Sequence, residues 1–285
     1  MKILITGGTG FVGVRLKSFL ERSHEVVAVG SHELDITQTD AVLKLVESVD
    51  PDAIVHLAAI AVTDYCEQHP EESYAVNVEG AVNVANAAKS VGAKLLFASS
   101  EQVYHAVETE GQQPEQQAVT PTRIYAVHKL EAERRVQEIL PSAVGLRLTW
   151  MYDVPSSPFP KNSGLLVQLL KAAEEGRAVK ASTRERRGIT NVWEVVRRVE
   201  MALALPGGIY NFGSPNDLSS FDIWLAAAEL MVEKGWMDAK PSTLVLPDES
   251  WTRNLGLDLR SIEAHGITFP STLTGLRNAV FHARK

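Results

Sequence analysis

The sequence of 285 residues contains a single cysteine, Cys66, and no long run of apolar residues. One cysteine excludes an intramolecular disulfide and leaves no thiolate partners for a zinc site, so we expect no metal and interpret Cys66 as a structural thiol. No apolar run approaches the roughly 18 residues that a membrane helix needs. The chain passes from Met1 directly into a strand pattern, without a signal peptide. These absences favour a soluble, cytoplasmic protein with no membrane partner.

Positive charge is also scarce, because 28 Lys and Arg residues stand against 35 Asp and Glu, a formal net charge of −7. That balance gives no electrostatic reason to expect a nucleic acid partner. One basic cluster exists, formed by Arg184, Arg186 and Arg187. Hydrophobic residues make up 45% of the chain and charged residues 22%, the composition of an ordinary globular enzyme.

Short apolar runs alternate with amphipathic stretches through the first half of the chain. The apolar runs predict buried strands, and stretches with apolar residues three and four apart predict helices. Strands and helices that alternate in this way form a parallel sheet with helices on both faces. The expected strands are 2–6, 25–29, 53–57, 94–98 and 143–148, and the expected helices are 11–22, 40–49, 70–91 and 122–140.

Beyond residue 150 the pattern loosens, and helices are expected at 163–175, 192–204, 221–234 and 271–283. We therefore predict an α/β protein with two parts. Residues 1–150 form a Rossmann-like, doubly wound parallel sheet that binds a dinucleotide. Residues 151–285 form mainly a smaller substrate-binding lobe, with some segments returning to the sheet.

The first expected strand opens into a glycine-rich loop, in which residues 6–13 read Thr-Gly-Gly-Thr-Gly-Phe-Val-Gly. Gly7 allows a tight turn, Gly10 lets the backbone approach a pyrophosphate, and Gly13 lets the next helix pack on the sheet. The N–H groups and the positive end of that helix would face the phosphates. We predict a cofactor site made of these glycines together with Phe11 and Val12.

The second expected strand ends in Val29-Gly30-Ser31-His32, where many dehydrogenases carry an acidic residue that binds the adenosine ribose. No carboxylate stands in these four positions. Ser31 and His32 could therefore donate hydrogen bonds to a 2′-phosphate, and we predict a weak preference for NADP(H) over NAD(H).

A catalytic trio is predicted from Ser100, Tyr125 and Lys129. Tyr125 and Lys129 stand four residues apart in an expected helix, on one face. A free tyrosine has a pKa of about 10, and a nearby ammonium should lower it and make the phenol a better acid–base group. Lys129 could also hold the nicotinamide ribose, and Ser100 could orient a substrate carbonyl while hydride comes from the cofactor.

Together these motifs resemble the extended short-chain dehydrogenases/reductases, the superfamily of NAD-dependent epimerases and dehydratases. The resemblance implies that Asp35 and Ile36 lie around the adenine. It also implies that Leu57, Ala58 and Ala59 line the cofactor after the third strand. The predicted activity is that of an NAD(P)-dependent oxidoreductase.

Within that superfamily the chain looks most like the dTDP-4-dehydrorhamnose reductase branch. Residues 61–80, the strand 146–152 and the closing segment 254–259 carry this similarity. It implies reduction of the keto group of a nucleotide-linked deoxysugar, with Trp150 lining the sugar and Arg187 meeting the diphosphate. Many members dimerise through helices next to the catalytic tyrosine, so a homodimer is one expectation.

Several positions depart from the family pattern and keep alternatives open. Gln102, a predicted substrate residue, replaces a tyrosine, and Trp251-Thr252 replaces an Arg-Pro pair. Dehydratases need an Asp-Glu pair where Glu101 and Gln102 stand here, which disfavours that chemistry. An epimerase or another ketone reductase remains an alternative. So does a regulatory subunit without turnover, like the relative that partners methionine adenosyltransferase. The sugar, the nucleotide and the pathway are left open.

Overall fold

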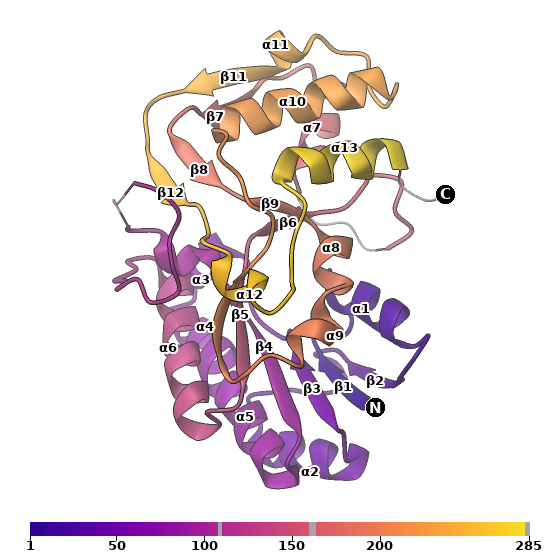
Figure 1. Cartoon of the computed structure of the whole chain (residues 1–285), viewed down its shortest axis with the longest axis vertical. Helices are drawn as coiled ribbons and strands as arrows, with labels where there is room; N and C mark the ends of the chain where they lie inside the picture. Colours follow the sequence, from indigo (N-terminus) through magenta and orange to yellow (C-terminus); the bar gives the residue numbers. More distant parts are fainter. Residues whose placement is uncertain (108–109, 160–163, 283–285) are drawn as a thin grey trace. The chain divides into compact units, whose positions relative to one another are not determined.

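The computed structural model describes residues 1–107, 110–159 and 164–282, and the chain divides into two compact units (Figure 1). Unit 1 consists of Met1–Ala106, Ala118–Leu148 and Val196–Asn211. Unit 2 consists of Val107–Gln117, Thr149–Val195 and Phe212–Lys285. Both units are discontinuous in the sequence.

Unit 1 is built on a six-stranded sheet in the order β10-β5-β4-β3-β1-β2. The pairs among β1 to β5 are parallel, which confirms the predicted α/β class and parallel sheet. The chain adds β2 on one side of β1 and β3 on the other, so the winding reverses there, where such sheets bind ligands. The strands are β1 (Lys2–Thr6), β2 (Glu25–Val29), β3 (Ala53–His56), β4 (Lys94–Ser100), β5 (Val144–Leu148) and β10 (Gly208–Phe212).

The helices of unit 1 cover this sheet, and α2, α5 and α6 share one apolar core with its strands. Residues 70–91, predicted as one helix, are three successive pieces with a π-helical turn in the middle. Such turns are rare insertions in a helix and periodicity does not reveal them. The helical elements of unit 1 are α1 (Gly13–Leu20), α2 (Thr39–Val49), α3 (Thr63–Gln68), α4 (Pro70–Tyr74), η1 (Ala75–Glu79), α5 (Gly80–Val91), the 3₁₀ turn η2 (Glu101–Tyr104), α6 (Ile124–Ile139) and α9 (Val199–Ala202).

Unit 2 combines helices with three pairs of short parallel strands, β6–β9, β7–β11 and β8–β12. Its own apolar core joins residues of α7, α10 and α13. The predicted helix 192–204 is wrong as one element, because it is split into α8 and α9. Residues 163 and 283, the ends of two predicted helices, lie outside the described residues. The strands are β6 (Trp150–Tyr152), β7 (Val179–Ser182), β8 (Glu185–Arg187), β9 (Ile189–Asn191), β11 (Val245–Asp248) and β12 (Arg253–Leu255). The helices are α7 (Leu165–Glu174), α8 (Val192–Val196), α10 (Ser220–Glu233), α11 (Pro241–Leu244), α12 (Arg260–Glu263) and α13 (Thr272–His282).

Within the described part of the chain, no helix has both the length and the apolar character needed to cross a membrane.

Candidate functional site

The loop after β1 uses its glycines in two different ways. A Cβ atom on Gly7 would lie 2.6 Å from the Ala58 nitrogen, and one on Gly13 would lie 2.2 Å from the Gly7 carbonyl oxygen. Gly7 also has a φ of +69°, which favours glycine. The fold itself therefore requires these two glycines. A Cβ atom on Gly10 would meet the Gly7 oxygen at 3.1 Å, and among the described residues it would meet nothing else within 4 Å. Gly10 is also exposed, so its other side is open.

Helix α1 begins at Gly13, three residues after this open position, with Val12 as its N-cap residue. Within the described residues no side chain caps this N-terminus. Phe11 and Val12 are half-buried, whereas Thr9 and Gly10 are exposed. A helix N-terminus carries a positive partial charge that favours phosphate groups. The open side of Gly10 next to this N-terminus fits the pyrophosphate of a dinucleotide.

The segment 57–59 follows β3, is half-buried, and contacts the glycine loop at Gly7. At the ends of β1 and β3, the Thr6 hydroxyl and the His56 Nδ1 atom form a buried hydrogen bond of 2.7 Å. Burial, with a smaller effect from the positive charge of Lys129, lowers the pKa of His56 to about 3. His56 is therefore a neutral, structural partner of the loop at physiological pH.

A carboxylate that the sequence analysis did not assign lies at the end of β2. The Glu33 side chain folds back and accepts a hydrogen bond of 2.9 Å from the Gly30 nitrogen. A Cβ atom on Gly30 would lie 2.5 Å from the Thr9 hydroxyl, so the glycine loop is next to this turn. Ser31 and His32, the predicted 2′-phosphate donors, are exposed in the same turn. The turn therefore brings the Glu33 carboxylate, three positions after Gly30, back to the end of the strand. The residues directly after the strand do not reveal it.

Asp35 and Ile36, the pair predicted around the adenine, have different surroundings. The Asp35 carboxylate is exposed and accepts hydrogen bonds from the Thr37 hydroxyl at 2.7 Å and the Thr37 nitrogen at 3.0 Å. These bonds hold the pKa of Asp35 below its ordinary value. The Ile36 side chain is buried in the core of unit 1, next to Gly80.

Ser100, Tyr125 and Lys129 come together in unit 1, and each is at most 8% exposed. Ser100 ends β4, and its side chain accepts a hydrogen bond of 3.2 Å from the Gln102 nitrogen. Ser100 also lies close enough to Tyr125 to lower the pKa of that phenol. The Lys129 Nζ atom lies 5.8 Å from the centre of the Tyr125 ring and donates a hydrogen bond of 3.0 Å to the Ala98 carbonyl.

The protonation of this trio differs from the prediction in one respect. Burial raises the pKa of Tyr125 to about 12, and the nearby Ser100 hydroxyl opposes the rise only in part. The predicted lowering of the Tyr125 pKa by an ammonium is therefore wrong for this structure, because loss of hydration outweighs any charge effect. Burial also lowers the pKa of Lys129 to about 8, and the negative charge of Glu133 opposes that fall.

Two other residues support this region. Cys66, which is buried, lies close enough to raise the pKa of both Tyr125 and Lys129. Asn77 sits in the π-helical turn and clamps the chain after β3, since its amide accepts from the Ile60 nitrogen at 2.9 Å and donates to the Ile60 carbonyl at 3.0 Å. π-Helical turns are frequent at functional sites.

The predicted substrate residues belong to both units. In unit 2 the Arg187 guanidinium lies 5.2 Å from the centre of the Trp150 ring, which indicates a cation–π contact. The buried Glu185 carboxylate, which accepts a hydrogen bond of 2.8 Å from Arg253 Nε, lies 3.9 Å from the Arg187 Nη1 atom, an ion-pair distance. In unit 1, Gln102 is half-buried and bonded through its backbone to Ser100.

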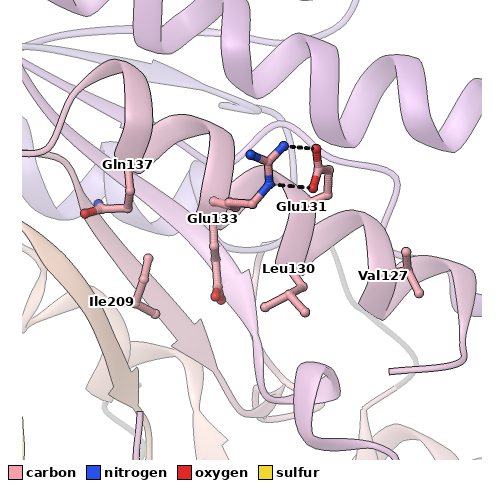
Figure 2. Close-up of a pocket in the computed structure, with 7 residues that line it drawn as sticks. Val127, Leu130, Glu131, Glu133, Gln137 and Ile209 are labelled. Carbon is pink, nitrogen blue, oxygen red and sulfur yellow. Dashed lines mark hydrogen bonds and ion pairs between the residues drawn. The ribbon is translucent and has the colours of Figure 1, made fainter. Parts of the chain in front are cut away.

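A separate pocket lies on unit 1 along helix α6. Figure 2 shows side chains that line it, Glu131 and Glu133 among them. Arg134 donates two hydrogen bonds to the Glu131 carboxylate, at 3.0 and 2.6 Å. No residue of the predicted cofactor, catalytic or substrate set lines it. The lining residues are Val127, Leu130, Glu131, Glu133, Arg134, Gln137 and Ile209.

The family model of the RmlD substrate binding domain matches residues 1–241 of this chain. A dTDP-4-dehydrorhamnose reductase from Mycolicibacterium smegmatis is 34% identical over 152 residues, which are 53% of this chain and 46% of the relative. Over the matched region, the chain spans about half the length of this curated relative.

Two further similarities are informative. The solved structure of a dTDP-4-dehydrorhamnose reductase from Bacillus anthracis in complex with NADP superposes with a TM-score of 0.85 and 22% identity, covering 99% of this chain and 98% of the other. At that identity the similarity shows the fold alone. The methionine adenosyltransferase 2 subunit beta of Bos taurus is 30% identical over 162 residues, 53% of this chain and 47% of the relative.

Proposed function

Since this chain belongs to the RmlD substrate binding domain family, we propose that it is an NAD(P)H-dependent oxidoreductase that reduces the keto group of a nucleotide-linked deoxysugar. The observation that carries this proposal is the meeting of Ser100, Tyr125 and Lys129 in unit 1, the unit that also holds the open glycine loop. Carbonyl reduction needs a hydride on carbon and a proton on oxygen. The glycine loop would hold the cofactor that supplies the hydride, and the buried Tyr125 phenol would supply the proton.

The chain's own residues would act on the carbonyl oxygen. The bound cofactor supplies the hydride. Tyr125 is protonated at neutral pH, because its pKa is about 12, and would donate its hydroxyl proton to the developing alkoxide. Ser100, close to Tyr125, would orient and stabilise the same oxygen. The Lys129 charge would favour the tyrosinate that remains after proton transfer.

For the cofactor we propose NADP(H) in weak preference to NAD(H). Ser31 and His32 are exposed at the end of β2 and can donate to a 2′-phosphate. The Glu33 carboxylate opposes this preference, because its negative charge would repel the phosphate. The hydrogen bond from the Gly30 nitrogen keeps the Glu33 carboxylate in this turn. We therefore propose that the preference for NADP(H) is only weak.

For the substrate we propose that Arg187 binds the diphosphate and Trp150 borders the sugar. A guanidinium that is held over an aromatic ring and beside a buried carboxylate loses little freedom on binding an anion. Gln102, next to Ser100 in the η2 turn, would contact the sugar near the reacting carbonyl.

The test is a titration of the purified protein with NADPH and NADH, followed by NAD(P)H oxidation with an enzymatically generated dTDP-4-keto-6-deoxysugar. We expect binding of both cofactors, tighter for NADPH, and turnover of the keto sugar. Binding without turnover would contradict the reductase but keep the dinucleotide site. NAD that stays bound through purification, with interconversion of sugar epimers, would indicate an epimerase. No binding of either cofactor would contradict both proposals.

One observation favours a second candidate, a dinucleotide-binding regulatory subunit. It is the similarity to the methionine adenosyltransferase 2 subunit beta. This role needs the cofactor cradle but not proton transfer from Tyr125. Co-purification with a larger enzyme whose activity changes on addition of this chain, together with no turnover of keto sugars, would support it over the reductase.

A further inference from the structure

A buried ion pair in unit 1 joins helix α6, which carries Tyr125 and Lys129, to the neighbouring strand β5. Glu133 is one turn after Lys129 on helix α6, and Arg147 is on β5; they are 3% and 4% exposed. Arg147 donates from Nε to Glu133 Oε1 at 2.9 Å and from Nη2 to Oε2 at 2.7 Å. The guanidinium and the carboxylate therefore face each other with two bonds, the arrangement that fixes both groups most strictly.

The same carboxylate reaches the strand that carries the predicted serine. Glu133 Oε1 accepts a hydrogen bond of 2.5 Å from the hydroxyl of Ser99, which is buried and immediately precedes Ser100 on β4. One side chain thus connects helix α6, with Tyr125 and Lys129, to the end of β4, with Ser100. The link does not pass through any of the three predicted catalytic side chains.

Arg147 extends the network to two other elements. Its Nη1 atom donates to the Tyr104 hydroxyl at 2.6 Å, and that hydroxyl donates to Asn211 Oδ1 at 3.0 Å. Tyr104 ends the η2 turn that begins after Ser100, and Asn211 lies on β10. All of these side chains are buried. The network therefore joins α6, β4, η2, β5 and β10.

Stability alone is a weak explanation for this arrangement. A buried ion pair often contributes no more to stability than apolar side chains of the same volume, because both charges lose their hydration. What such a pair supplies is a fixed geometry and a local charge. Here the geometry is that of the two elements that carry the trio, and the charge lies one turn from Lys129.

On this basis, and resting on the proposed reductase function, we propose that Glu133, held by Arg147, is a positioning residue that fixes Ser100 relative to Tyr125 and places a negative charge one turn from Lys129.

The groups around Lys129 on the packed elements agree with this role. Helix α6 contributes Glu133 and the Tyr125 ring, β4 contributes the Ala98 carbonyl, α3 the Cys66 thiol, and β3 the neutral His56. The Glu133 carboxylate acts in the direction that raises the pKa of Lys129, against the lowering by burial, which leaves that pKa at about 8. Removing the carboxylate should therefore lower the pKa further. A lysine that must be charged loses its effect as the pH rises through its pKa, so the basic limb of activity should move to lower pH.

The test compares the pH profiles of kcat for the wild type and Glu133→Gln. We expect the basic limb to move down by about one pH unit, which is about a tenfold loss of charged lysine above it. At pH values well below the limb, where Lys129 stays charged, KM for NADPH should change little. The matched control is Glu131→Gln on the same helix, whose carboxylate pairs with Arg134 at the surface. It should leave the profile unchanged.

Glu133→Gln leaves Arg147 buried without its counterion and can fail to fold. The double variant Glu133→Gln with Arg147→Met removes both charges, keeps a similar volume, and should show the same downward shift. An unshifted basic limb in a folded variant that lacks the carboxylate would overturn the positioning role. If the wild type has no turnover at all, the reductase proposal fails separately. The pH dependence of NADPH binding then gives the test. As the pH rises, loss of the Lys129 charge should begin to weaken NADPH binding at a lower pH in the variants than in the wild type. Identical binding curves would overturn the inference.

Discussion

The two units differ in how they are built and in which residues they contain. Unit 1 has a long parallel sheet, the glycine loop and the predicted trio. Unit 2 has only two-stranded sheets within its described part, and it holds every tryptophan of the chain: Trp150, Trp193, Trp224, Trp236 and Trp251. The difference suggests a division of labour. Unit 1 would bind the cofactor and move the proton, whereas unit 2 would recognise the rest of the substrate.

The sharpest way to break this comparison is to remove the proton donor from unit 1. Tyr125→Phe should lower kcat by at least about 100-fold, because general acid catalysis contributes about 10²–10⁴. The dissociation constant of NADPH, measured by fluorescence, should stay within about twofold. The control is Tyr74→Phe, an exposed tyrosine in the same unit. An unchanged kcat for Tyr125→Phe would contradict the catalytic assignment.

A second change separates the two kinds of glycine in the loop. Gly10→Val should abolish NADPH binding, because its side chain enters the space proposed for the pyrophosphate, while the melting temperature changes little. Gly13→Ala should instead destabilise the fold, since its Cβ would lie 2.2 Å from the Gly7 oxygen. Calorimetry and binding titrations of both variants check this. A normal dissociation constant for Gly10→Val would refute the proposed cradle.

A third change is directed at unit 2. Arg187→Ala should raise KM for the nucleotide sugar by about 10–100-fold, the effect of losing about 1.5–3 kcal/mol of charged hydrogen bonding. The dissociation constant of NADPH should not change. Arg186→Ala, the exposed neighbour on β8, is the control and should have the wild-type KM. Equal effects of both substitutions would place the diphosphate elsewhere.

The smallest expected effect concerns the choice of cofactor. Ser31→Asp should shift the ratio of NADP to NAD affinities towards NAD by about fivefold, since like charges a few Å apart near water repel by about 1 kcal/mol. Glu33→Gln should shift it the opposite way by a similar factor. Titrations of each variant with both cofactors measure the ratio. If neither substitution changes it, the 2′-phosphate does not lie at this turn.

Periodicity predicted the strands β1 to β5 because each is long enough to show an apolar run. β1, β3, β4 and β5 are largely buried on both faces, whereas most of β2 is only half-buried. It missed β10, which follows two glycines, and every strand of unit 2, where segments such as Glu185–Arg187 are too short and too polar for a pattern. Partner strands of unit 2 are also far apart in the sequence, so only the fold brings Arg253 of β12 beside Glu185 of β8.

The candidate site was predictable where its chemistry depends on spacing. The glycines and the pair Tyr125 and Lys129 are of this kind. Glu133 was missed because its role depends on Arg147 and Ser99, which only the packing of α6 on β4 and β5 brings near. The direction of the Tyr125 pKa was wrong because burial is a property of the fold and cannot be read from two residues on a helix.

The most direct test of the account follows hydride into the product. The protein is incubated with a dTDP-4-keto-6-deoxysugar and NADPH that carries deuterium at the transferred position, and the sugar is analysed by mass spectrometry and NMR. The account predicts one deuterium on the new carbinol carbon and one NADP formed per sugar reduced, with both products formed at least about 100-fold more slowly by Tyr125→Phe. An unlabelled, unreduced sugar in the presence of bound NADPH would contradict it.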